Sequence, residues 1–369
     1  MAAGNGQTGP ALVLSAGGAR GAYQVGAMKA IVERRPQATF SVITGTSIGA
    51  VNGAVMAEGI QSGKLAETLA RLSSEWLAME GLLRLNWRSL LAALGSVIRY
   101  GPSPKVLQAM RSLLDGVPLV QRLSRLVPPD RRMGDYQKVE LVVTTTDLNS
   151  GTTVAFDRAA GDVRVIDAVL ASAAFPVVFP SRLVAGHWQV DGGVFDHTPL
   201  GQVIRRGGRD IFVIGTSPHC GEQGASPQTG PFADIYHVVH RLWPLILDQL
   251  LYEDVREARR INEIVSIIEE SPNPDSPLIR RLKAAIGYEK EGRRKRVVGI
   301  VEICPQAELT PPGTFGFGDR AAIQKIMEQG YQDALQVLGR LPAPGVNTRG
   351  GGAGRLHGAA PYVRARGRP

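Results

Sequence analysis

Apolar runs and amphipathic stretches alternate along the first sixty residues. Residues 11–15 (ALVLS) predict a short buried strand, and residues 22–34 carry apolar side chains at helical spacing until the chain reaches Pro36. Residues 40–44 (FSVIT) predict a second strand, and residues 50–60 predict a second helix. A glycine-rich turn separates each strand from its helix. This repeated order favours a doubly wound, mostly parallel sheet.

The pattern downstream continues the same organisation. Further strands are predicted at residues 138–146, 152–156, 183–190, 210–216 and 296–303. Helices are predicted at residues 164–174, 199–206, 232–268 and 319–339. We therefore expect one main α/β domain of three layers, with helices on both faces of a mostly parallel central sheet.

A long helical segment interrupts this alternation. Residues 63–126 read as helical, and part of them form an amphipathic stripe of large apolar side chains: Leu82, Leu83, Trp87, Leu90, Leu91, Leu94, Val97 and Ile98. Residues 60–132 carry eleven Lys and Arg against five Asp and Glu. We expect a helical cap insertion over the carboxyl ends of the strands, where sites of α/β proteins lie. It suits either a solvated layer covering the sheet or a surface for anionic lipids.

Composition sets the domain organisation. The 369 residues are 44% hydrophobic and 20% charged, which excludes a collagen, a coiled coil and wholesale disorder. We expect a flexible N-terminus at residues 1–10, a body at 11–220, a helical and strand elaboration packed on the same domain at 221–340, and a tail at 341–369. The tail is rich in Gly and Pro and holds five arginines and no acid, so we expect it to be disordered and basic.

The cysteine count and the charge distribution limit the cellular compartment and the partners that we expect. Cys220 and Cys304 are too few for a disulfide framework or a zinc site, so a reducing compartment is expected. No apolar run is long enough for a membrane span, and no secretion signal is evident, so we expect a cytoplasmic protein. The basic cluster within residues 290–296 lacks interleaved aromatic side chains and reads as a solvated loop, so no nucleic-acid partner is expected despite a net charge of +9.

The first candidate site is the sequence Gly45-Thr46-Ser47-Ile48-Gly49, which matches G-x-S-x-G between a strand and a helix. In such a strained turn the serine hydroxyl is lifted above the sheet, and the glycines keep neighbouring backbone from clashing. The same residues also fit a glycine-rich turn with an incidental serine.

The second candidate is the glycine-rich loop at residues 16–21 (AGGARG), between the first strand and its helix. Backbone N–H groups at a helix N-terminus favour negative charge, so the loop suits a phosphate cradle or an oxyanion hole, or simply tight packing. A literal G-x-G-x-x-G at Gly4, Gly6 and Gly9 precedes the first strand and is rejected as a dinucleotide motif.

The third candidate is Asp191-Gly192-Gly193, where an aspartate at the end of a strand is followed by two flexible residues. Taken alone, it reads equally as an ordinary Asp-Gly turn. Together with the other two motifs, and with TTTDLNSG at residues 144–151 and ASAAFPVVFP at 171–180, it resembles the patatin-like phospholipase family over residues 11 to about 220.

The resemblance implies a patatin-like fold and a Ser-Asp dyad that hydrolyses lipid esters. Ser47 is then the nucleophile and Asp191 the general base; the loop glycines, among them Gly17, Gly18 and Gly21, bind the oxyanion or shape its loop, and Arg20 braces them. The elbow glycines Gly45 and Gly49 and the motif glycines Gly192 and Gly193 fall in matching positions. No metal or organic cofactor is implied. The implied substrate is a lipid ester, with peripheral contact to an anionic membrane as a further expectation.

Other residues in the sequence suit the same chemistry. His197 is the strongest suspect for a third member of a triad, while Asp147 and Asp196 are rival carboxylates. Ala16 stands where the family usually has a glycine, and it would be strained if that position required a positive φ. An acyltransferase uses the same machinery. A non-catalytic anion- or nucleotide-binding protein and a membrane-bound scaffold with an inactive dyad are the other readings.

Overall fold

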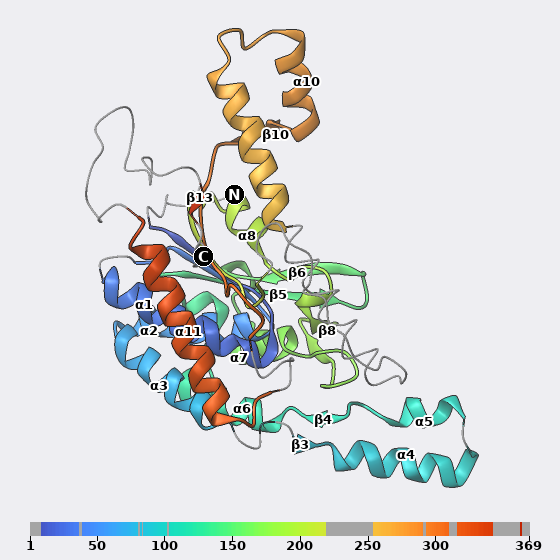
Figure 1. Ribbon diagram of the computed structural model, residues 1–369. Helices are drawn as coiled ribbons and strands as arrows, with labels where there is room; N and C mark the ends of the chain where they lie inside the picture. The colour runs from blue at the N-terminus through green and yellow to red at the C-terminus, as the bar shows by residue number, and fades with distance from the viewer. Residues whose placement is uncertain are drawn as a thin grey trace.

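A mixed sheet with helices on both faces forms the body of the protein (Figure 1). The computed structural model describes residues 9–36, 39–79, 82, 84–101, 103–218, 254–290, 293–309, 316–341 and 362–363. Within them the sheet has nine strands: β1 Ala11–Leu14, β2 Val42–Thr46, β5 Glu140–Asp147, β6 Thr152–Phe156, β7 Arg182–Val184, β8 His187–Asp191, β9 Asp210–Ile214, β12 Gly299–Ile303 and β13 Tyr362–Val363.

The strand order is β13-β12-β9-β1-β2-β5-β8-β7, with β6 also paired to β5. All neighbours from β13 to β5 are parallel, whereas β6, β7 and β8 pair antiparallel. The antiparallel part follows from short turns. Ala185 and Gly186, both at positive φ, link β7 directly to β8, as a two-residue hairpin requires. The expected mostly parallel α/β sheet is confirmed.

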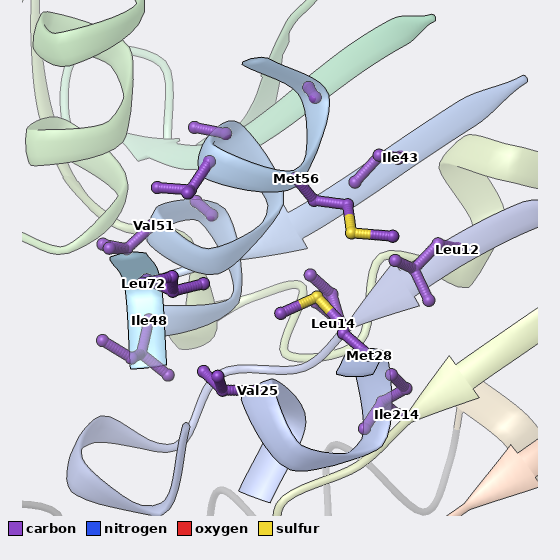
Figure 2. Packing of buried hydrophobic residues seen from close by; sticks show 14 of the residues in the cluster. Leu12, Leu14, Val25, Met28, Ile43, Ile48, Val51, Met56, Leu72 and Ile214 are labelled. Carbon is purple, nitrogen blue, oxygen red and sulfur yellow. The ribbon is translucent and has the colours of Figure 1, made fainter. Parts of the chain in front are cut away.

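Helices cover the sheet on both sides because side chains alternate along its strands. On one face Leu12 and Leu14 of β1 pack against α1 (Gly21–Arg34) and α2 (Ile48–Ser62), as Figure 2 shows. The same face carries α3 (Leu65–Leu77), α7 (Val165–Ser172) and α11 (Arg320–Leu338). On the other face Ala11 and Val13 pack against α8 (Leu200–Arg205) and the first residues of a helix at 254–270. These are the three expected layers.

The segment expected to be a helical cap is divided in the structure. Helices α3 and α6 (Val117–Leu126) contribute to the core, whereas α4 (Trp87–Tyr100) and α5 (Pro104–Ala109) extend away from the body (Figure 1). A two-stranded ribbon of β3 (Arg84–Leu85) and β4 (Leu114–Asp115) leads to them, whereas the sequence pattern predicts only helix there. Of the predicted stripe, Leu82 is buried in the core before α4 and Leu83 lies outside the described residues. The part on α4 does not cover the sheet, because its members Trp87, Leu91, Leu94, Val97 and Ile98 are exposed.

The C-terminal part adds α10 (Pro277–Ile286) and a small ribbon of β10 (Glu289–Lys290) and β11 (Arg293–Arg294). In the segment expected to be a disordered tail, Tyr362–Val363 differs from the prediction, because it pairs with β12 at the edge of the sheet. Most of that tail, most of the expected flexible N-terminus and part of the helix expected at 232–268 lie outside the described residues. Among the described helices, none combines the length and the apolar character that crossing a bilayer demands.

Candidate active site

Ser47 occupies a strained turn between β2 and α2. Its φ is 56° and its ψ is −122°, a conformation that residues with a Cβ rarely adopt. The flanking glycines are needed for close backbone approach. A Cβ at Gly45 would lie 2.3 Å from the carbonyl oxygen of Gly49, and a Cβ at Gly49 would lie 2.3 Å from that of Leu14. The G-x-S-x-G sequence is therefore a sterically determined elbow that raises Ser47 above the sheet.

The register of three strands brings Asp191 to this elbow. Thr46 of β2 lies opposite Thr144 of β5, and Thr145 of β5 lies opposite Asp191 of β8. The Ser47 side chain acts as a hydrogen-bond partner of the Asp191 carboxylate and lowers its pKa. Two residues that are 144 positions apart in the sequence thus meet because β5 pairs with both of their strands.

The carboxyl group of Asp191 is buried and held in place. Its Oδ1 accepts a 2.7 Å hydrogen bond from the backbone N–H of Gly193, and its own N–H donates to the Ala174 carbonyl at 3.0 Å. Gly192 must lack a side chain, because a Cβ there would lie 2.4 Å from the carbonyl oxygen of Thr144. Burial raises the pKa of Asp191 to about 7, although the hydrogen bonds from Ser47 and Gly193 act in the opposite direction.

The glycine-rich loop lies between the elbow and the Asp191 turn. A Cβ at Gly49 would lie 2.6 Å from the Ser15 carbonyl oxygen, and one at Gly193 would lie 3.4 Å from Ala16 Cβ. Within the described part of the chain, the backbone N–H groups of Gly17 and Gly18 have no protein acceptor. Two unengaged N–H donors therefore stand beside a serine and a buried carboxylate.

Two side chains fix the shape of this loop. Arg20 is buried, and its Nε donates to the Gly17 carbonyl at 3.4 Å, in line with the bracing role that the resemblance implies. Thr216, which follows β9, donates a 2.7 Å hydrogen bond from its hydroxyl to the Ala16 carbonyl. Ala16 itself has no positive φ, so the departure from the family's usual glycine costs no backbone strain.

Sequence reasoning missed Ser172, which supports the elbow from α7. Its hydroxyl accepts a 2.8 Å hydrogen bond from the backbone N–H of Ser47 and donates at 2.7 Å to the Thr144 carbonyl. Ser172 lies in the run at residues 171–180, which resembles the patatin-like family. That resemblance was the available signal, but it assigns no role to this serine.

A buried amide network was also missed. Gln24 of α1 donates to the Ser15 carbonyl at 2.7 Å, Asn52 of α2 donates to Gln24 Oε1 at 2.9 Å, and Trp76 of α3 donates to Asn52 Oδ1 at 3.0 Å. Asn52 also donates to the carbonyl of Gly21 at 3.0 Å. The network joins the start of the glycine-rich loop to the helix that follows Ser47.

The patatin-like phospholipase model matches residues 12–204, which is more than half of the chain. The chain belongs to the patatin-like phospholipase family. Two NTE family proteins, one of Mycobacterium bovis and one of Mycobacterium tuberculosis, are each 31% identical to it over 221 residues. These residues are 60% of this chain and 52% of each relative, so the chain spans about half the length of the curated relatives it matches. Among solved structures, VipD from Legionella pneumophila aligns with a TM-score of 0.40 at 15% identity, over 90% of this chain and 67% of that one.

In this patatin-like chain the rival carboxylates have other partners. Asp147 accepts hydrogen bonds from the backbone N–H of Asn149 at 2.7 Å and from the ring of His187 at 2.9 Å. Burial acts to raise the pKa of Asp147, but the hydrogen bonds outweigh it and the pKa is lowered. Burial raises the pKa of Asp196, and the side chain of Gln202 acts in the opposite direction. Of these three carboxylates, Asp191 is the one whose pKa the Ser47 side chain lowers.

His197 is buried behind the glycine-rich loop, and its carbonyl accepts from the Ala16 N–H at 3.0 Å. Burial, together with the nearby charge of Arg20, lowers the pKa of His197 to about 3, so its ring is neutral near pH 7. Neither ring nitrogen of His197 bonds to Ser47 or Asp191. Among the described residues, no group of three or more His, Cys, Asp or Glu side chains is arranged to hold a metal ion.

Proposed function

We propose that this patatin-like protein is a lipid acyl hydrolase that uses Ser47 as nucleophile and Asp191 as general base. The observation that carries the proposal is the buried carboxyl group of Asp191, whose pKa is raised to about 7 and on which the Ser47 side chain acts as a hydrogen-bond partner. A carboxylate with an ordinary pKa is a weak base for a hydroxyl, and a pKa near the working pH improves proton transfer. The substrate class, an ester of a lipid, is taken from the family.

The first half-reaction forms an acyl-enzyme. The oxygen of Ser47 attacks the acyl carbon while its proton passes to Asp191. The backbone N–H groups of Gly17 and Gly18 stabilise the negative charge that develops on the carbonyl oxygen. When the tetrahedral intermediate collapses, the bond to the alcohol breaks and Asp191 returns the proton to the departing alkoxide.

The second half-reaction releases the acyl group. A water molecule gives its proton to Asp191 and attacks the acyl carbon of the ester on Ser47. Collapse of the second intermediate frees the fatty acid, and Asp191 returns the proton to the Ser47 oxygen. An alcohol in place of water would give acyl transfer by the same steps, so transferase activity is the second candidate function.

Exposed apolar residues beside the pair support a lipid substrate. Phe195 follows the Asp191 turn and Val177 lies in the loop after α7, and both are exposed although large and apolar. A substrate with long acyl chains resides in membranes, so we also propose that the protein meets an anionic membrane peripherally.

An active-site-directed fluorophosphonate tests the proposal, because it labels a serine only where the oxygen is activated. We expect labelling of the wild-type protein and hydrolysis of p-nitrophenyl esters, and we expect both to be lost in Ser47→Ala. Asp191→Asn should lose most of the turnover. Ser74→Ala on the exposed face of α3 and Asp147→Asn are the matched controls and should keep it. Hydrolysis that survives Ser47→Ala would show that Ser47 is not the nucleophile. A wild-type protein that is neither labelled nor hydrolytic would leave the non-catalytic anion-binding reading of the glycine-rich loop as the better one.

A further inference from the structure

The segment 84–115, which we call the arm, buries small polar side chains and exposes large apolar ones. It comprises β3, α4, α5 and β4, and it extends from the body at the lower right of Figure 1. Helix α4 buries two serines: the hydroxyl of Ser89 accepts hydrogen bonds from the N–H groups of Arg111 and Ser112 at 3.2 and 3.3 Å, and Ser96 is buried as well. Small polar residues thus face the rest of the arm, which leaves the large apolar side chains of the helix outward.

The outward face is a continuous apolar stripe. Trp87, Leu91, Leu94 and Ile98 follow one another at helical spacing, and they are 62%, 65%, 56% and 79% exposed. Single exposed apolar residues need no explanation, but four on one face of one helix form a patch of the kind that marks an interaction site.

The charge of the arm indicates which kind of surface it binds. Residues 81–114 contain no Asp or Glu, and their five basic residues are all exposed: Arg84, Arg88, Arg99, Lys105 and Arg111. The Tyr100 ring lies beneath Lys105 Nζ at 4.1 Å. Trp and Tyr at the border between apolar and polar surfaces, together with basic residues on the polar side, are typical of helices that lie in a membrane interface.

We propose that the arm docks on an anionic lipid bilayer, with the stripe among the acyl chains and the basic residues at lipid phosphates. A second copy of this chain is a poorer occupant, because two arms that each carry five basic residues and one acid, Asp115, would repel each other. Anionic lipid satisfies both halves of the surface, since it offers hydrocarbon to the stripe and negative charge to the arginines.

The root of the arm is attached next to the candidate active site. The N–H groups of Leu113 and Leu114 donate at 3.0 and 2.8 Å to the carbonyls of Val177 and Val178. The same loop begins just after Ala174, whose carbonyl accepts from the N–H of Asp191. A docked arm therefore fixes the distance between the bilayer and Ser47. This consequence rests on the proposed function, but docking itself requires no turnover.

Vesicle co-sedimentation with the full chain tests docking, in a Ser47→Ala background so that no lipid is consumed. We expect binding to phosphatidylcholine vesicles that contain phosphatidylglycerol, weaker binding to phosphatidylcholine alone, and a decrease at high salt. Leu91→Gln with Ile98→Gln should weaken the partition by at least about tenfold, because two large side chains no longer leave water. Leu278→Gln on α10, an exposed leucine outside the arm, is the matched control and should bind as before.

Charge is tested separately from apolar contact. Arg88→Gln with Arg99→Gln should weaken binding to anionic vesicles by about tenfold or more, whereas Arg88→Lys with Arg99→Lys should retain it. Arg280→Gln with Arg281→Gln on α10 removes two exposed charges elsewhere and is the control. If the control pair weakens binding as much as the arm pair, attraction by net charge explains the result and the arm is not the docking surface.

Insertion of the stripe has its own readout. Lipids brominated on their acyl chains should quench tryptophan fluorescence on binding, and Trp87→Phe should remove part of that quenching while Trp188→Phe removes less. Unchanged quenching in Trp87→Phe overturns the proposal, as does a wild-type protein that binds no anionic vesicle. The proposal is also overturned if the protein forms a dimer without vesicles and Leu91→Gln with Ile98→Gln dissociates that dimer. Each arm variant is also made with Ser47 intact, and its hydrolysis of a short soluble ester is measured. This separates a failure of docking from a failure of the proposed chemistry.

Discussion

Asn52 Nδ2 donates a 2.9 Å hydrogen bond to Gln24 Oε1 in the closed space between α1 and α2. Both amides are fully buried, and each continues the chain of hydrogen bonds, Gln24 to the carbonyl that precedes the glycine-rich loop and Asn52 to the indole of Trp76. Buried amides whose partners are all satisfied hold their neighbours in one arrangement. This pair therefore sets where the two unengaged N–H groups stand relative to the serine elbow.

Gln24→Leu should destabilise the protein and slow turnover together. The substitution removes the Gln24 donor from the Ser15 carbonyl and the Gln24 acceptor from the Asn52 amide in a dry interior, at a cost of about 2–4 kcal/mol in the free energy of unfolding. Denaturant unfolding and ester hydrolysis measure the two effects. Gln332→Leu, an exposed glutamine on α11, is the control and should change neither. An unfolding free energy equal to that of wild type would show that the network does not hold the loop.

The pH dependence of turnover should follow the ionisation of Asp191. A base must be ionised to accept the serine proton, and burial places the pKa of Asp191 at about 7. We expect kcat/KM to rise with pH through an apparent pKa of about 7 and then to level off. A profile that is already level well below neutral pH would point to a base with an ordinary carboxyl pKa.

Stability should depend on pH in the opposite direction. The pKa of Asp191 is raised in the folded state, so folding favours the protonated form and the protein loses stability as the pH rises from about 4 to about 7. A rise from 3.8 to about 7 corresponds to at most about 4 kcal/mol. Asp191→Asn should remove this loss, so that it stabilises the protein more at about pH 8 than at about pH 5, as measured by denaturant unfolding.

Asp147→Asn provides the contrasting case for that measurement. The pKa of Asp147 is lowered in the folded state, so its contribution is present at neutral pH and is lost as the pH falls through the folded pKa. The asparagine variant should be less stable than wild type near neutrality and should approach it in acid. If both variants showed the same pH dependence, Asp191 would not be the buried group that the structure describes.

Gly17→Ala should disable the glycine-rich loop. An added Cβ would lie 2.2 Å from Thr216 Oγ1, so the loop has to move and its N–H groups with it. Loss of one oxyanion donor costs about a hundredfold or more in turnover, and we expect a loss of that size in kcat. Gly95→Ala on α4 adds a Cβ in open space and removes a helix-interior glycine. That control should keep its activity on soluble esters and gain up to about 1 kcal/mol in stability.

The sequence allowed much of the architecture to be predicted because its signals are local. Ser47 follows an apolar strand directly, Asp191 ends one, and Gly17 and Gly18 lie between a strand and its helix, so each could be placed at a strand end. The partners that hold them could not be found in this way. Ser172 acts on Ser47 from 125 positions away, and its contact depends on how α7 packs.

The arm shows the limit of hydrophobic periodicity. The spacing on α4 identified an amphipathic helix correctly, but periodicity states only that one face is apolar. It does not say whether that face meets the protein or its surroundings. The decisive information is the burial of Ser89 and Ser96, which comes from tertiary packing alone.

The register through β5 has a consequence for how this chain tolerates change. Because β2 and β8 are both aligned on β5, the meeting of Ser47 with Asp191 owes nothing to the peptide between β3 and β4. That peptide leaves and rejoins the body through one two-stranded ribbon, the pair of β3 and β4. A graft that keeps the ribbon should retarget the molecule to another surface while the chemistry stays in place.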